Sequence, residues 1–287
     1  MSKNESISYQ TIQQTQIYLN AENADIDING TMKSNQVFFF PNTIKIEKTA
    51  IEMRLSLVNA QIPVSWYLIN STNNLFMISI NNGLSYTTYY FPTGNYNVNT
   101  FLVKFNSLNY GMKLTYDSIL SKFTFTSTSS EFMIKDNENN KSLLPFLGFK
   151  MYNTYASGFG ILWSAYPVNF SGLPRINIKS SSFNIKNIDS SYKGLTRTLC
   201  SVPCKGLAGG TIVYNNLTNY HYIFKNHELN SIAIEITDDF DNYIDFNNID
   251  WCITLQIDIV NEVVQSMDDL TDIYEYHSQS INKLLNK

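Results

Sequence analysis

Charged side chains are scarce in this chain. Lys, Arg, Asp and Glu make up 15% of its 287 residues, against about 25% in typical soluble domains, and the formal net charge is −4. The polar surface therefore has to come from Asn, Ser and Thr. Copies of such a chain repel one another little, which favours a subunit of an assembly over a freely diffusing monomer. Because Lys and Arg are not clustered, we do not expect nucleic acid as the primary partner.

Long hydrophobic runs are also missing. The first thirty residues contain no apolar stretch of the kind found in a signal peptide. Nowhere does the sequence reach the 18 or so consecutive apolar residues that suggest a membrane span. We therefore expect synthesis in the cytosol and no membrane span.

Motifs for catalysis and metal binding are absent as well. His221, His227 and His277 lie far apart and form no i, i+2 or i, i+4 pair. Cys200 and Cys204 are four residues apart, but no second Cys or His pair stands near them to complete a zinc site. The sequence holds neither G-x-S-x-G nor a phosphate-binding glycine loop. We expect no catalytic residue, no bound metal and no cofactor, and hence a protein that is not an enzyme.

Cysteine is rare too. Cys200, Cys204 and Cys252 are too few and too irregularly spaced for a disulfide framework, and we expect reduced, buried thiols. Two polar segments could suggest a ligand. Residues 238–243 (DDFDNY) could hold Ca²⁺ but lack the spacing and final Glu of an EF-hand, so a solvated turn is expected. Residues 206–210 (GLAGG) lack a following Lys-Ser/Thr, and we expect a flexible connector.

Apolar residues are abundant, at 44% of the chain with 14% aromatic. At about 25 cal/mol per Å² of buried apolar surface, such a chain can stabilise a substantial core. Many of these residues alternate with polar ones, which is typical of half-buried strands. In residues 249–260 one face carries Trp251, Ile253, Leu255, Ile257 and Ile259, and the other carries Thr254, Gln256 and Asp258. Further strands are expected at 37–41, 51–57, 75–80, 85–91, 175–186, 196–204, 211–216, 221–225 and 231–236.

A different pattern interrupts the strands. Apolar residues recur at helical spacing over residues 98–108, with Asn97 as the expected N-cap and Gly111 as the expected stop. A hairpin of residues 112–116 and 122–126 follows, and residues 131–135 are a candidate third strand. We interpret this helix and hairpin as a small inserted α+β domain.

About eight strands around one insertion predict an all-β dominated chain, a single jelly-roll β-sandwich with the inserted α+β domain. The predicted parts are an N-terminal arm (1–33), a discontinuous jelly roll (34–92 and 165–262), the insertion (93–164) and a C-terminal tail (263–287). The arm is polar and carries little periodicity. The tail has apolar residues near helical spacing, so it is either an amphipathic partner-binding helix or a frayed terminus.

Five segments in this order resemble penton, or minor capsid, proteins of virophages and related large DNA viruses. They are SLVNAQIPVSWYLIN (56–70), FPTGNYNVNTFLVKFNSLN (91–109), KLTYDSILSKFTFT (113–126), LLPFLGF (143–149) and IAIEITDDFDNYIDFNNIDWCITLQI (232–257). The resemblance spans most of residues 50–260 and implies a single jelly roll that assembles as homopentamers at the vertices of an icosahedral virion. Neighbouring major capsid capsomers would be its partners, and a fibre or host receptor could bind above the vertex.

Two other functions stay open at this stage. The chain could be a virion host-attachment or glycan-binding jelly-roll module, with a site in the insertion, because exposed Tyr and Trp suit sugar stacking. It could also act on glycosides, which would require two convergent carboxylates about 5 to 10 Å apart. For the capsid function, we further expect the polar arm to reach adjacent capsomers.

Overall fold

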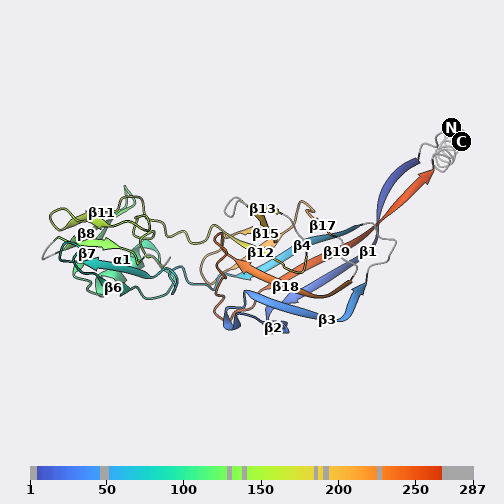
Figure 1. Ribbon diagram of the computed structural model, residues 1–287, viewed down its shortest axis with the longest axis horizontal. Helices are drawn as coiled ribbons and strands as arrows, with labels where there is room; N and C mark the ends of the chain where they lie inside the picture. The colour runs from blue at the N-terminus through green and yellow to red at the C-terminus, as the bar shows by residue number, and fades with distance from the viewer. Residues whose placement is uncertain are drawn as a thin grey trace, which may run out of the picture. The chain divides into compact units, whose positions relative to one another are not determined.

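The computed structural model describes residues 5–45, 52–127, 131–137, 141–183, 187–189, 194–224 and 228–266. The chain forms two compact units, each with its own strands and core (Figure 1). Unit 1 consists of Met1–Val64 and Arg175–Lys287, and unit 2 consists of Ser65–Pro174.

Two antiparallel sheets make up most of the described part of unit 1. The first sheet has the order β1-β19-β4-β16, and β17 also pairs with β4. Its strands are β1 (Glu5–Asn20), β19 (Cys252–Ser266), β4 (Glu52–Pro63), β16 (Thr211–Asn215) and β17 (Tyr222–Phe224). The second sheet has the order β15-β12-β18-β3-β2. Its strands are β15 (Thr198–Pro203), β12 (Arg175–Lys179), β18 (Glu228–Thr237), β3 (Asn35–Lys45) and β2 (Ile26–Asp27).

The order of these strands along the chain is that of a jelly roll. β1, β4, β16 and β19 belong to the first sheet, and β3, β12, β15 and β18 belong to the second. Two antiparallel sheets of four main strands each, connected mostly from one sheet to the other, form the eight-stranded jelly roll. The fold class predicted from the sequence is therefore confirmed, and unit 2 is inserted between β4 and β12.

Alternation along the strands fills the core of unit 1. The apolar face predicted for residues 249–260 is confirmed, since Ile253, Leu255 and Ile257 are all buried in β19. Trp251 just before this strand is fully buried, and its indole Nε1 donates a hydrogen bond of 2.6 Å to the carbonyl of Lys33. Buried in this way, the indole satisfies its one polar atom while the ring packs in the core.

The prediction that residues 1–33 form an N-terminal arm is wrong for the described part of this segment, residues 5–33. β1 pairs with β19 from Glu5, opposite Ser266, to Asn20, opposite Cys252. Ile17 and Leu19 on this strand are buried. The rest of the segment contains β2 and the 3₁₀ turns η1 (Ala21–Asn23) and η2 (Gly30–Met32). The polar composition that indicated an arm belongs instead to an edge strand, whose outward residues face solvent.

Two further boundaries differ from the predictions. The strand expected at 175–186 ends at Lys179, and a small hairpin of β13 (Asn187–Asp189) and β14 (Gly194–Thr196) follows. The predicted tail begins inside β19, which runs to Ser266, and residues 267–287 lie outside the described part of the chain.

The glycine-rich segment 206–210 is a hydrogen-bonded turn, and its prediction as a flexible connector is wrong. The Val64 N–H donates to the Gly210 carbonyl at 2.8 Å, and the Gly209 N–H donates to the Val64 carbonyl at 2.9 Å. A Cβ on Gly206 would lie 2.8 Å from a methyl carbon of Val64. Glycine is needed here because the backbone approaches the Val64 side chain closely.

The described residues of unit 2 form two small sheets and one α-helix. One sheet has the order β10-β9-β5-β6 and the other has the order β11-β8-β7. The elements are β5 (Leu75–Ser79), β6 (Thr87–Tyr90), α1 (Val98–Ser107), β7 (Met112–Asp117), β8 (Lys122–Ser127), β9 (Met133–Lys135), β10 (Tyr155–Ala156) and β11 (Ile161–Trp163).

The insertion is longer than the predicted 93–164. Two strands assigned to the jelly roll, β5 and β6, pair with each other, and β5 also pairs with β9. These pairings place all three strands in unit 2. β9 was expected as the third strand of the 112–126 hairpin, but β11 holds that position beside β8.

The predicted helix and its cap are confirmed. Asn97 accepts a hydrogen bond of 2.9 Å from the Thr100 N–H, and the Thr100 hydroxyl accepts one of 3.0 Å from the Asn97 N–H. This reciprocal capping box defines the start of α1. At its other end, Leu108 forms the C-cap, three residues before Gly111.

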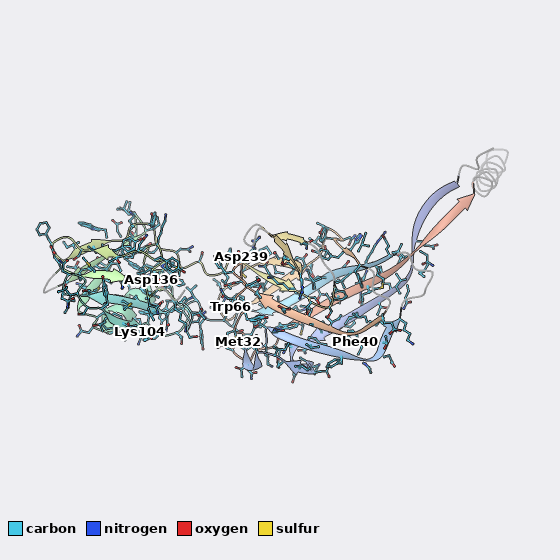
Figure 2. The ribbon with its side chains drawn as sticks, viewed as in Figure 1. Met32, Phe40, Trp66, Lys104, Asp136 and Asp239 are labelled. Carbon is cyan, nitrogen blue, oxygen red and sulfur yellow. The ribbon has the colours of Figure 1, made fainter. Side chains whose placement is uncertain are left out.

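Aromatic rings dominate the core of unit 2. Phe105 on α1 is fully buried, and its ring centroid lies 5.0 Å from that of Tyr110 and 5.9 Å from those of Phe76 and Phe125. The buried Asp136, labelled in Figure 2, accepts a hydrogen bond of 2.8 Å from the Tyr152 N–H. Within the part of the chain that is described, no helix is long and apolar enough to span a membrane.

Candidate functional site

The outward face of the first sheet of unit 1 is built from amides and hydroxyls. We call it the amide face. Its residues alternate with the core residues on three neighbouring strands. Those on β1 are exposed, and those on β19 and β4 are half-buried except for Thr254, which is buried. The members are Gln14, Gln16 and Tyr18 on β1, Thr254, Gln256 and Asp258 on β19, and Arg54, Ser56 and Asn59 on β4. Two of these nine side chains are charged, and one of them, Arg54, pairs with Glu52 at the start of β4. The face therefore carries little net charge, and a second protein surface could cover it at a small electrostatic cost.

Hydrogen bonds hold the side chains of the amide face across the strands. Gln14 Nε2 donates to Asp258 Oδ1 at 3.0 Å, and Gln256 Nε2 donates to the same oxygen at 3.1 Å. Thr254 Oγ1 donates to Asn59 Oδ1 at 3.1 Å. Side chains that are already held lose less conformational entropy when a partner binds, so this face is preorganised for contact.

Tyr18 is the large aromatic side chain on the amide face. It is 74% exposed, and its hydroxyl donates a hydrogen bond of 2.6 Å to Gln16 Oε1. Tyrosine is enriched among the residues that contribute most to protein interfaces, because it brings a large rigid ring and a polar tip. Tyr18 is therefore the candidate anchor of a contact through this face.

β1 also forms the edge of its sheet. Among the described residues, its only strand partner is β19. A long edge strand presents unpaired N–H and C=O groups that can pair with another chain. The edge and the amide face together give unit 1 one continuous surface suited to a neighbour.

The outward face of the second sheet is different in character. Phe39 on β3 is 53% exposed, and next to it Val37 is half-buried opposite the half-buried Ala233 of β18. This apolar patch is bordered on the same face by Ser231, Asn35 and Glu235, and it contrasts with the amides of the other face. A ring of identical subunits needs two unlike, complementary surfaces on each copy. The two outward faces of this jelly roll are unlike in this sense, since one is rich in amides and the other carries an apolar patch.

The acidic run at 238–243 forms a tight turn after β18, as its composition predicts. Asp238 Oδ1 accepts hydrogen bonds from the N–H of Phe240 at 2.7 Å and from the N–H of Asn242 at 2.9 Å. An aspartate that bonds backbone groups two to four residues ahead stabilises a turn.

The other carboxylates of this run form ion pairs with β12. Arg175 Nε donates to Asp239 Oδ1 at 2.6 Å, and the nearly buried Lys179 pairs with Asp241 (Figure 2 labels Asp239). Among the residues that the structure describes, no three His, Cys, Asp or Glu side chains are grouped so that they could hold a metal. The two ion pairs hold the loop between β18 and β19 against β12.

The three cysteines differ in environment. All are free, with Cys200 and Cys204 half-buried and Cys252 exposed, so the expectation of a buried thiol is wrong for Cys252. Burial raises the pKa of the Cys200 thiol, and burial together with the nearby Asp239 raises the pKa of Cys204 to about 11. Since the thiolate is the nucleophile, both half-buried thiols are poorly reactive at neutral pH.

We expect Cys252 to be alkylated first by iodoacetamide at pH 8, and Cys204 about a hundredfold more slowly than an ordinary thiol, because its thiolate fraction is lower. The raised pKa of Cys204 stabilises the native state below pH about 9, and that contribution is lost as the pH rises through about 11. Mass spectrometry of tryptic peptides over a time course measures the alkylation rate at each cysteine. Equal alkylation rates at Cys204 and Cys252 would contradict the half-buried environment of Cys204 and the exposed environment of Cys252.

The amide face was not predicted from the sequence, because residues 14–18 were expected to belong to an arm. A signal was present, since Gln16 and Tyr18 alternate with Ile17 and Leu19 in the period of a strand. Of the three histidines, His221 lies half-buried just before β17, while His227 and His277 lie outside the described residues.

A likeness to known proteins is found among solved structures. No family model matches the sequence, and no curated protein matches it. Among solved structures, the chain is similar to the crystal structure of the selenomethionine-labelled penton protein of mavirus, with a TM-score of 0.45 and 11% sequence identity. The match covers 86% of this chain and 100% of the mavirus chain.

Proposed function

We propose that this chain is a structural capsid protein that forms pentameric vertex capsomers of an icosahedral DNA virus. The observation that carries the proposal is a jelly roll with two unlike outward faces, one of which is preorganised, nearly uncharged and bordered by a long edge strand. The ring size of five comes from the resemblance of the five sequence segments to penton proteins. In this proposal the chain is not an enzyme, and it resides in the virion after synthesis in the host cytosol.

The proposed contact joins the amide face of one copy to the Phe39 face of the next. Such a contact is heterologous, and repeating it with a rotation of one-fifth of a turn closes a ring. A stable interface buries about 800 Å² on each partner, or roughly 20 to 30 residues a side, which is on the scale of one sheet face with its edge strand. Neighbouring major capsid capsomers are the proposed outer partners of the ring.

The proposal predicts that Tyr18→Ala weakens ring formation without unfolding the protein. A central aromatic anchor contributes about 2 kcal/mol or more, which corresponds to about thirtyfold in affinity at each contact. Because Tyr18 is largely exposed in the single copy, the thermal midpoint should stay near that of the wild type. Sedimentation velocity over a concentration series measures the assembly.

Tyr220→Ala serves as the matched control, since Tyr220 is also an exposed tyrosine of unit 1 but lies in the loop between β16 and β17. It should assemble like the wild type. If Tyr18→Ala and the wild type form rings with the same concentration dependence, the amide face is not the contact surface.

A further inference from the structure

The outward face of the β11-β8-β7 sheet in unit 2 carries an exposed tryptophan among threonines and lysines. The register places Trp163, Thr124 and Thr115 in one row across the three strands, and Ile161, Thr126 and Lys113 in the next. The neighbouring residues Leu162, Phe125 and Leu114 are buried on the opposite face. We call the outward surface the Trp163 face.

Trp163 is not used for folding. Its side chain is 64% exposed, whereas the other two tryptophans, Trp66 and Trp251, are 8% and 0% exposed. The strand that carries it is firmly held, because the next residue, Ser164, donates its hydroxyl to the Leu147 carbonyl at 2.6 Å and accepts the Phe123 N–H at 3.1 Å. A rigid backbone therefore presents a large indole to solvent.

Hydroxyl and ammonium groups lie on the same sheet face as the indole. Thr124, Thr126 and Thr115 supply hydroxyls that both donate and accept hydrogen bonds. Lys113 lies exposed in the neighbouring row, and Lys122 on β8 donates from Nζ to the Ala165 carbonyl at 3.1 Å. An aromatic plane beside short hydroxyl side chains matches the two surfaces of a sugar ring, an apolar C–H face and a rim of hydroxyls.

The charge of unit 2 favours an acidic ligand. Its sequence has six lysines, no arginine and four acidic residues, within a chain whose net charge is negative. The carboxylate on the Trp163 face belongs to Asp117, opposite Lys122. Asp117 Oδ1 accepts the N–H groups of Ile119 at 2.8 Å and Leu120 at 3.1 Å, so this carboxylate is engaged in the hairpin turn.

We propose that the Trp163 face binds a carbohydrate that bears a carboxylate, such as a terminal sialic acid. The sugar ring stacks on Trp163, the threonines bond its hydroxyls, and the lysines attract its carboxylate. This inference does not rest on ring formation, and it gives unit 2 a role in attachment to a glycan-coated surface.

Tryptophan fluorescence tests the proposal with 3′-sialyllactose as the probe and lactose as the neutral control. Because the other two tryptophans are buried, a change in emission on binding reports Trp163. We expect a saturable change with 3′-sialyllactose in the millimolar range and none with lactose. No saturable change with sialyllactose, or equal responses to the two sugars, would overturn the proposal.

Saturation-transfer NMR on single-residue variants separates the contributions of Trp163 and Lys113 to sugar binding. Trp163→Ala should weaken binding of 3′-sialyllactose about tenfold or more, whereas Tyr90→Ala, an exposed aromatic on the other sheet of unit 2, should leave it unchanged. Lys113→Glu should weaken binding while retaining the wild-type fluorescence spectrum of the free protein. Binding that survives both Trp163→Ala and Lys113→Glu contradicts the proposed site. Self-association that Trp163→Ala abolishes would instead identify another copy as the occupant.

Discussion

Replacing Phe105 with alanine is expected to lower the free energy of unfolding of unit 2 by about 3–5 kcal/mol. The ring is fully buried and lies against Phe76, Tyr110 and Phe125. Its removal forfeits the burial of a large apolar side chain and leaves a cavity among neighbouring rings that collapse only in part. Unit 1 has a separate core, so its stability should change little.

Hydrogen exchange followed by mass spectrometry distinguishes the two units. In Phe105→Ala, protection should fall in peptides from residues 98–126 and persist in peptides from β19. Phe159→Ala is the matched control, because Phe159 is 97% exposed and its truncation should cost less than about 0.5 kcal/mol. Equal loss of protection in β19 and in unit 2 would show that the units do not unfold separately.

Removing residues 1–20 is expected to prevent unit 1 from folding stably. β19 would lose the partner it pairs with along its whole length, and the buried Ile17 and Leu19 would leave the core. An arm, as first predicted from composition, could be deleted with rings intact. The structure predicts the opposite, because an edge strand that contributes core residues is part of the sandwich.

A point substitution keeps this prediction testable if the truncated chain is insoluble. Leu19→Ala should cost about 2–5 kcal/mol, whereas Tyr18→Ala, one residue earlier but facing outward, should leave the thermal midpoint nearly unchanged. Denaturant unfolding followed by circular dichroism measures both. A truncated chain with wild-type stability and intact rings would restore the arm hypothesis.

Local patterns in the sequence were enough to predict much of the fold. The alternation in β19 identified its buried face, and Asn97 identified the start of α1. The hairpin of β7 and β8 followed from two alternating segments around a turn. Each of these features is decided by residues close together in the chain, so a single sequence contains the necessary information.

Long-range pairing was what the sequence could not supply. β9 pairs with β5, more than fifty residues earlier, and β1 pairs with β19 at the opposite end of the chain. Nothing local distinguishes a strand that joins one sheet from a strand that joins another. The insertion was therefore predicted too short, and the first strand was assigned to an arm.

The amide face and the Trp163 face could not be predicted from the sequence for a related reason. Tyr18 and Gln16 carry ordinary polar and aromatic side chains, and only the register with Thr254 and Gln256 shows that they form one continuous face. Trp163 likewise stands in a short strand with no motif around it. The exposure of its indole is a property of the folded sheet.

Native mass spectrometry of the chain over a concentration series is the sharpest test of pentamer formation. We expect a closed species of five copies, whose abundance rises with concentration and falls in Tyr18→Ala. A chain that stays monomeric at every concentration, or that closes into rings of another size, would contradict the assignment to the capsid vertex.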